Sequence, residues 1–225
     1  MSDILSISFG LTSSLSANTD MLISTLPFGT SEQERLRSIK NDKALSLSLS
    51  ALLALKSLID MQDKPIESSQ LTILRSANRK PYFKDLDLFF SLSHTDGIAL
   101  CALCHKPVGI DIEWIDEKVN FLDISKRFFS AEEQAYVSES ASPLLAFYSL
   151  WTKKEACAKL TGEGLISVCK GNPSNIGFCK QYLLEYNGKR GIISLCCTKA
   201  DDVQIHGAEK ELVIYELNTE EQNEL

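Results

Sequence analysis

The sequence lacks any run of eighteen consecutive apolar residues, so we expect no segment of it to span a membrane. Basic residues are in the minority, with 23 Lys and Arg against 30 Asp and Glu, and the net charge of −7 argues against non-specific binding to nucleic acid. The opening residues "MSDILSISFG" lack the basic stretch of a secretory signal. These absences predict a cytoplasmic protein that binds neither membranes nor nucleic acid.

Cysteine is present but follows no disulfide pattern. The seven Cys are an odd number without regular spacing, which argues against a disulfide framework and favours a reducing compartment. Cys101 and Cys104 form a CxxC pair, but they lie in the strand-like run "IALCALC" and no second pair with a nearby His completes a zinc site. We therefore expect both side chains to pack in the core.

The first half of the chain predicts strands around one long helix. The alternating "ILSISFGL" predicts an opening strand, and Ser31 with Glu34 predicts a capping box at the start of "SEQERLRSIKNDKALSLSLSALLALKSLI". The alternating "ALSLSLSALLAL" also fits a strand, but length and cap favour a helix. A strand and turn follow at "LTILRSANRKPYF", and "FFSLSHTDGIALCALCHKPVGIDIEWI" predicts strands joined by a tight turn at residues 105–107.

The second half repeats this order loosely. Ser130 with Glu133 caps one helix, and the clearest helix begins at Ser142 and Pro143 and stops at Gly162. Strands are expected near 176–186, 190–197 and 211–217, with turns at 187–188 and between 201 and 207. The whole pattern predicts an α+β fold with mainly antiparallel sheet.

Two carboxylates interrupt the predicted strand "VGIDIEWID", residues 108–116. Alternate side chains of a strand share a face, so Asp111 and Glu113 lie together on the face opposite Ile110 and Ile112. A divalent cation such as Mg²⁺ would remove their mutual repulsion. A solvated face is the alternative, because antiparallel sheets often expose one side to water.

A third carboxylate lies on an apolar stripe of the clearest helix. Tyr148, Trp151, Glu155 and Ala158 are spaced by three and four residues, which places them on one helical face. A carboxylate there needs a compensating cation or hydrogen bonds. A third metal ligand at Glu155 is one interpretation, and an ion pair with Lys159 at i+4 is the other.

Ser93 and His94 precede a turn at residues 95–97. A hydroxyl, an imidazole and backbone N–H groups suit a phosphate group. A Ser/His hydrolase is the alternative, but neighbouring residues of a strand point to opposite faces and so make a poor nucleophile–base pair.

These stretches together resemble a known signature. "VGIDIE", followed about forty residues on by "LWTKKEACAKLTGEGL" and preceded by "RKPYF…FFSLSHTDG", is similar to the three motifs of surfactin-type (Sfp-type) 4′-phosphopantetheinyl transferases. Trp151, Lys154, Glu155 and Lys159 form the most specific motif, W-x-x-K-E-x-x-x-K. The N-terminal third and the last fifty residues match only in pattern.

The resemblance implies a pseudodimer of two similar α+β halves that bind coenzyme A in the cleft between them. We expect residues 1–106 to form the N-terminal half and residues 107–225 the C-terminal half, which carries the metal site. We expect the chain to be a monomer.

The resemblance also implies site residues. Asp111, Glu113 and Glu155 would bind Mg²⁺, with Mn²⁺ as an alternative, and Lys159 would contact the pyrophosphate of coenzyme A. Nucleotide contacts would come from Lys80, Ser93 and His94, and from basic residues of the first helix, namely Arg35, Arg37, Lys40 and Lys43.

Two positions depart from the family pattern. Arg79 replaces the usual Gly before Lys-Pro, and Asp42 is followed by "KAL" where the family often has an Arg. These departures concern the contacts to the 3′-phosphate and leave the metal ligands unchanged.

The implied reaction moves 4′-phosphopantetheine from coenzyme A to a serine hydroxyl of an apo acyl or peptidyl carrier protein domain and releases adenosine 3′,5′-bisphosphate. Glu155 is the expected base, directly or through a water, and Lys159 would stabilise charge on the pyrophosphate. Carrier docking is expected on residues 115–130, with Phe128 and Phe129 in the core. The alternatives are a Mg²⁺-dependent phosphohydrolase of coenzyme A or a related nucleotide, and a non-catalytic coenzyme A-binding protein, against which the intact acids argue.

Overall fold

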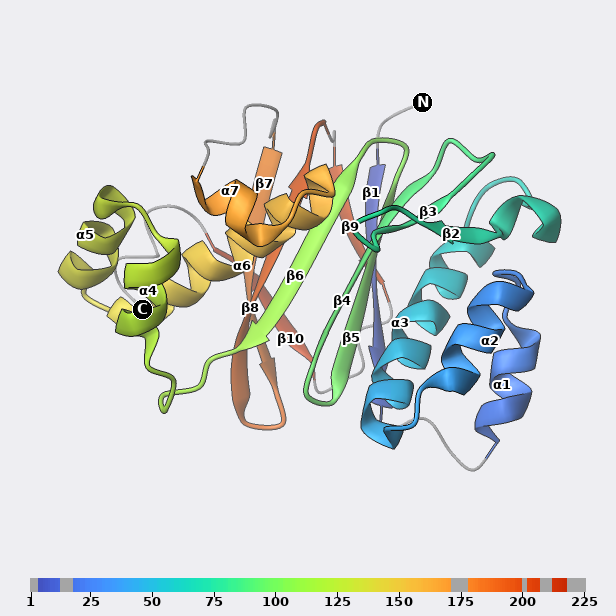
Figure 1. The fold of residues 1–225 in the computed structure, drawn as a ribbon, viewed down its shortest axis with the longest axis horizontal. Coiled ribbons are helices and arrows are strands. Elements are labelled where there is room, and N and C mark those ends of the chain that lie inside the picture. The colour runs from blue at the N-terminus through green and yellow to red at the C-terminus, as the bar shows by residue number, and fades with distance from the viewer. Residues whose placement is uncertain (1–3, 13–17, 171–177, 200–201, 207–211, 218–225) are drawn as a thin grey trace.

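Two four-stranded sheets lie next to each other, and a long helix covers each of them (Figure 1). The computed structural model describes residues 4–12, 18–170, 178–199, 202–206 and 212–217. The strands are β1 (Ile4–Leu11), β2 (Ile73–Arg75), β3 (Pro81–Phe83), β4 (Phe89–Thr95), β5 (Ile98–Cys104), β6 (Val108–Trp114), β7 (Phe178–Tyr186), β8 (Lys189–Cys197), β9 (Asp202–His206) and β10 (Val213–Glu216). The helices are α1 (Thr19–Thr25), α2 (Thr30–Ser38), α3 (Asp42–Asp60), the 3₁₀ turn η2 (Ser68–Leu71), α4 (Phe121–Phe128), α5 (Ala131–Glu139), α6 (Pro143–Thr161) and α7 (Leu165–Lys170). The predicted α+β fold with mainly antiparallel pairing is confirmed.

The first sheet has the strand order β4-β5-β1-β9. β1 pairs antiparallel with β5 and parallel with β9. The sequence predicted a turn between residues 201 and 207, and this prediction is wrong, because residues 202–206 form β9. β9 pairs with β1, which lies nearly two hundred residues away in the chain. Because this strand depends on a distant partner, the local sequence gave no signal for it. β9 therefore lies in the first sheet although it follows residue 106.

The second sheet has the order β10-β7-β8-β6, with antiparallel pairing throughout. The predicted turn at Asn187 and Gly188 joins β7 to β8, and both residues have positive φ, 50° and 72°. This is the combination that a tight hairpin turn requires. β7 and β10 confirm the strands predicted near residues 176–186 and 211–217. Residues 176, 177 and 211 of these predictions lie outside the described part of the chain.

The long N-terminal helix is broken in two. The predicted capping box of Ser31 and Glu34 is wrong, because Gly29, with φ of 87°, takes the N-cap position and places Ser31 inside the first turn of α2. The chain leaves helical geometry at Ile39, and Asn41 then caps α3 by accepting a hydrogen bond from the Ala44 N–H. The alternating residues after Asn41 are helical, which excludes the strand alternative.

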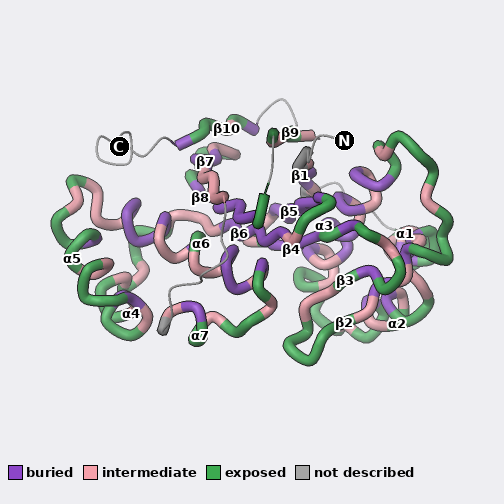
Figure 2. The backbone as a smooth tube through the Cα atoms, turned by 90° about the horizontal axis from the view of Figure 1, so that it is seen from above, coloured by how far each residue is buried: buried purple, intermediate pink, exposed green. Residues whose placement is uncertain are grey.

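β5, β6 and β8 are mostly buried on both faces, whereas the edge strands β9 and β10 are largely exposed (Figure 2). The inner faces share one cluster, to which β5 contributes Ile98 and Leu100 and β6 contributes Ile110 and Ile112. α3 covers the outer face of the first sheet and α6 that of the second. β5 is buried along its whole length, so the core-packing prediction for its CxxC pair is confirmed.

One disulfide joins β7 to β8. Cys179 and Cys196 are opposite each other in the antiparallel register, with Cα atoms 4.3 Å apart. The cysteine count predicted no disulfide framework, and it missed this single pair because only the strand register brings the two residues together.

No helix in the described part of the chain is long and apolar enough to cross a membrane.

Candidate active site

Side chains of β6 point alternately into the core shared by the two sheets and to the outer face of the second sheet. Val108, Ile110 and Ile112 are fully buried in the core cluster. On the other face Asp111 is only 5% exposed, and Glu113 is half-buried. The interpretation of this face as solvated is therefore wrong, and the reason is that α6 covers it.

Gly109 allows α6 to pack directly on β6. α6 runs from Pro143 to Thr161, and the left-handed Gly162, with φ of 75°, ends it where the sequence predicted a stop. A Cβ atom placed on Gly109 would lie 1.9 Å from the Ala156 carbonyl oxygen and 2.5 Å from the Leu160 nitrogen. Only glycine fits this contact, and the contact brings Glu155 and Lys159 beside Asp111.

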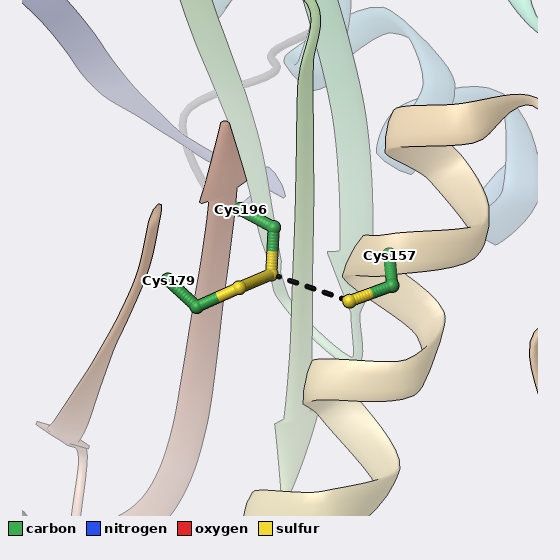
Figure 3. Close-up of side chains that lie close together, drawn as sticks. All are labelled: Cys157, Cys179 and Cys196. Carbon is green, nitrogen blue, oxygen red and sulfur yellow. Dashed lines mark hydrogen bonds between the residues drawn. A yellow bond between two sulfur atoms is a disulfide. The ribbon is translucent and has the colours of Figure 1, made fainter. Parts of the chain in front are cut away.

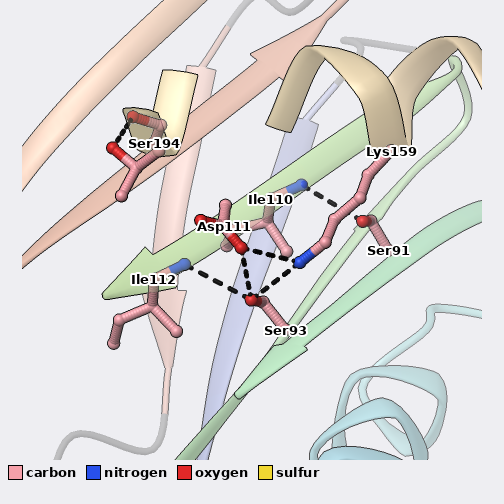
Figure 4. Close-up of polar contacts among 8 residues, drawn as sticks. Ser91, Ser93, Ile110, Asp111, Ile112, Lys159 and Ser194 are labelled. Atoms are coloured by element: carbon pink, nitrogen blue, oxygen red, sulfur yellow. Dashed lines mark hydrogen bonds and ion pairs between the residues drawn. The ribbon is translucent and has the colours of Figure 1, made fainter. Parts of the chain in front are cut away.

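Only one of the two carboxylate oxygens of Asp111 accepts hydrogen bonds from the described residues (Figure 4). Its Oδ1 accepts hydrogen bonds from Lys159 Nζ and from the Ser93 hydroxyl, each at 2.8 Å. Its Oδ2 is buried and has no hydrogen-bond partner among the described residues. Lys159 thus pairs with Asp111, so the alternative of a simple Glu155–Lys159 ion pair is not realised.

Two serine hydroxyls connect the sheets at this point. Ser91 Oγ accepts from the Ile110 N–H at 3.1 Å, and Ser93 Oγ accepts from the Ile112 N–H at 3.3 Å. Ser93 also accepts from Lys159 Nζ at 2.8 Å while it donates to Asp111. Its one donor and two acceptor positions are all used. This buried, fully bonded hydroxyl argues against the Ser/His hydrolase alternative.

Replacing Ser93 by Ala should destabilise the protein by about 1–3 kcal/mol, because the buried Ile112 N–H and Asp111 Oδ1 each lose a partner. Urea unfolding measures the change. Ser138→Ala is the matched control, since Ser138 is exposed and bonds only to the preceding turn of its own helix. Equal stability of the two variants would contradict the bridging role.

The carboxylates repel one another at short range. Burial, then the charge of Asp111, raises the pKa of Glu113 to about 7, although Lys159 opposes the shift. Burial and the charge of Asp111 also raise the pKa of Glu155. Neither Glu113 nor Glu155 has a hydrogen-bonded or ion-paired partner within the described ranges. In that part of the chain the three acids do not form a set whose oxygens all lie within 4.8 Å of one another.

These features fit a divalent cation. Asp111 Oδ2 is an acceptor without a partner, and the two neighbouring carboxylates are disfavoured in their charged forms. Carboxylate oxygens are the ligands that Mg²⁺ takes in proteins. One ammonium group, that of Lys159, compensates only part of this negative charge.

Comparison with known proteins identifies the region that holds these residues. A family model described as "4′-phosphopantetheinyl transferase superfamily" matches residues 107–204. This match covers 98 of the 225 residues of the chain. The matched region contains β6 and α6, and therefore all three acids and Lys159.

Curated phosphopantetheinyl transferases match over longer stretches. The 4′-phosphopantetheinyl transferase gsp of Aneurinibacillus migulanus is 34% identical over 136 residues, which are 60% of this chain and 55% of that protein. Sfp of Bacillus subtilis (strain 168) is 31% identical over 137 residues, 60% of each chain. The psf-1 protein of Bacillus pumilus is 41% identical over 109 residues, 47% of this chain and 45% of that protein. The chain spans about half the length of the curated relatives it matches.

A cavity of about 280 Å³ opens beside Glu155 and Lys159. Lys80, Arg79 and Glu163 also line it. Lys80 Nζ donates to the Leu160 carbonyl at 2.7 Å, and burial lowers the pKa of this lysine. The structure thus brings Lys80, in the turn before β3, to the same cavity as Lys159.

The other predicted phosphate contacts lie elsewhere. His94 is exposed at the end of β4, where partial desolvation and then the charge of Lys159 lower its pKa. Arg35 binds the buried Glu32 at 2.8 Å, and Lys43 pairs with Asp96 at 2.7 Å. Lys40 is exposed between α2 and α3. Of these residues, none lines the cavity, and their roles toward coenzyme A remain predictions.

Sequence reasoning missed two contributors to this site, Ser91 and Asn78, and named a third, Arg79, only as a departure from the family pattern. Ser91 bridges the sheets beside Ser93, and only the alternation "FFSLSH" hinted that both serines share a face. Asn78 Nδ2 donates to the Gly162 carbonyl at 2.8 Å and joins the turn before β3 to the end of α6. Arg79 adopts a positive φ of 63°, a conformation that glycine adopts readily, and it adds a cation to the cavity.

Proposed function

We propose that this chain transfers the 4′-phosphopantetheine group of coenzyme A to a serine hydroxyl of an apo carrier protein, with release of adenosine 3′,5′-bisphosphate. The observation that carries the proposal is the convergence of Asp111, Glu113, Glu155 and Lys159 beside one cavity, within the region that matches the transferase superfamily. Curated relatives named as 4′-phosphopantetheinyl transferases support the same activity.

Asp111, Glu113 and Glu155 would hold Mg²⁺, or Mn²⁺ in its place. Support comes from the unpartnered Asp111 Oδ2 and from the raised pKa of both glutamates. When bound, the cation supplies positive charge next to the pyrophosphate of the co-substrate.

The chain's own residues divide the remaining work. The ammonium group of Lys159, anchored on Asp111 and Ser93, would stabilise negative charge on the pyrophosphate as its bond to the leaving group breaks. Lys80 would bind a phosphate at the other wall of the cavity. Glu155 would accept the proton of the carrier serine, directly or through a water, as that oxygen attacks the β-phosphorus. Its raised pKa makes it a stronger base than an ordinary glutamate.

The carrier would dock on residues 115–130. Leu122 is 51% exposed on α4, and Lys118, Lys126 and Arg127 are exposed around it. Phe129 is buried, and the Phe128 ring packs edge-on against Trp151, with ring centroids 5.5 Å apart. Leu122 and the basic residues would therefore contact the carrier, and the two phenylalanines would pack α4 against the core.

Residues 1–106 and 107–225 would be the two halves of a pseudodimer. Each half contributes most of one sheet and one long covering helix, α3 or α6, although β9 crosses into the first sheet. Because one chain would supply both walls of the coenzyme A cleft, we expect it to act as a monomer. The cytoplasmic location stays a prediction.

One assay tests the function. The protein is incubated with coenzyme A, Mg²⁺ and apo acyl and peptidyl carrier domains, and the carriers are weighed by mass spectrometry. We expect a mass gain of one phosphopantetheine, lost in EDTA and restored by excess Mg²⁺. Cleavage of coenzyme A without a mass gain would instead establish the phosphohydrolase. Binding of coenzyme A with neither reaction would leave only the non-catalytic alternative.

A further inference from the structure

Three cysteine sulfurs meet between α6 and the strands β7 and β8 (Figure 3). The disulfide partners Cys179 and Cys196 come from β7 and β8, and the third residue, Cys157, comes from α6. The Cys157 sulfur lies 3.6 Å from that of Cys196, and all three sulfurs lie within 4.8 Å of one another. Cys157 follows Glu155 by two residues, so it projects from the far side of the helix.

The three sulfurs differ in their access to solvent. Cys157 is 3% exposed and Cys196 is fully buried, whereas Cys179 is half-buried at the edge of their apolar cluster. A small thiol or disulfide from solution therefore meets Cys179 first. The inner pair is shielded by Ala156, Leu160 and Val168.

We propose that Cys157, Cys179 and Cys196 form a thiol–disulfide exchange site that reacts with low-molecular-weight thiols and disulfides at Cys179. In the internal step, deprotonated Cys157 attacks the Cys196 sulfur. The Cys157–Cys196 bond forms as the Cys179–Cys196 bond breaks, and Cys179 leaves with the electron pair and takes up a proton. The step needs no oxidant, because one disulfide and one thiol are present before and after it.

The exchange changes which elements are joined. The starting bond links two strands that are already paired, whereas its product ties α6, the helix of Glu155 and Lys159, to β8. The released Cys179 thiol is then open to a small disulfide. Uncatalysed disulfide rearrangement takes minutes to hours, so we expect the exchange to be slow.

Trapping of Cys179 tests the exchange in the intact protein. The full chain is equilibrated with oxidised and reduced glutathione, transferred to iodoacetamide without denaturant, and sampled over hours. Tryptic peptides 155–159, 171–180 and 191–199 each carry one or more of the cysteines, and fragmentation distinguishes Cys196 from Cys197. We expect alkylated Cys179 and a cross-link between peptides 155–159 and 191–199 to rise together.

The controls separate internal exchange from simple exposure. In Cys157→Ala the alkylation of Cys179 should slow by about tenfold or more, because its disulfide has no internal attacker. Cys169→Ala removes a thiol outside the cluster and should behave as wild type. Circular dichroism checks folding, and Cys157→Ser replaces the alanine variant if that one unfolds. Equal rates in wild type and the Cys157 variant, no Cys179–Cys196 bond at the start, or no cross-link at the end would each overturn the proposal.

Discussion

Replacing Glu155 by Gln should reduce phosphopantetheine transfer by about 10²- to 10⁴-fold, the usual contribution of a positioned base. The amide keeps the size of the side chain but neither accepts the serine proton nor offers a charged oxygen to a cation. Initial rates of carrier modification at saturating coenzyme A measure the loss.

The same variant should fold normally. The raised pKa of Glu155 shows that the folded state disfavours its charged form, so the neutral amide removes a repulsion with Asp111. Urea unfolding should give a free energy equal to or slightly above that of wild type. Glu163→Gln is the matched control, because it removes an exposed carboxylate that lines the same cavity and does not contact Asp111, and it should keep nearly full activity. Full activity of Glu155→Gln would rule out its role as the base.

Replacing Gly109 by Ala should destabilise the protein by at least about 3 kcal/mol, at the upper end of overpacking effects. The new methyl group would meet the Ala156 carbonyl oxygen at 1.9 Å, and a backbone atom cannot rotate away as a side chain can. α6 must therefore move off β6 and carry Glu155 and Lys159 with it, so transfer should fall as well. Guanidinium unfolding and the carrier assay measure the two effects.

Gly164→Ala provides the control for the glycine substitution. A Cβ on Gly164 meets nothing within 4 Å, and no positive φ adds strain there, so its stability should stay within about 0.5 kcal/mol of wild type. A stability of Gly109→Ala equal to that of Gly164→Ala would contradict the close packing of α6 on β6.

Local signals predicted the elements whose partners lie nearby in the chain. The Ser130–Glu133 capping box, the Pro143 start and Gly162 stop of α6, and the Asn187–Gly188 turn are all present. Each rests on hydrogen bonds or φ values within a few residues, which the sequence specifies directly. The predictions failed at Ser31, where Gly29 offered a competing cap, and at β9, whose strand depends on a distant partner.

The candidate site was predicted in its residue types but not in its contacts. Period-two alternation placed Asp111 and Glu113 together, and the helical stripe singled out Glu155. The pairing of Lys159 with Asp111 instead of Glu155 could not be read from i+4 spacing, because it depends on how closely α6 approaches β6.

The sequence by itself determined that this protein carries an acidic strand, an acid-bearing helix and the resemblance that joins them, because side-chain order and helix or strand period are local properties. Tertiary structure alone decided that the acidic face of β6 is covered and that Ser91 and Ser93 bridge two sheets. It also decided that three cysteines from α6, β7 and β8 lie in contact. Burial and sulfur contacts depend on the packing of segments distant in the chain, and Gly109 shows how a single missing Cβ sets that distance.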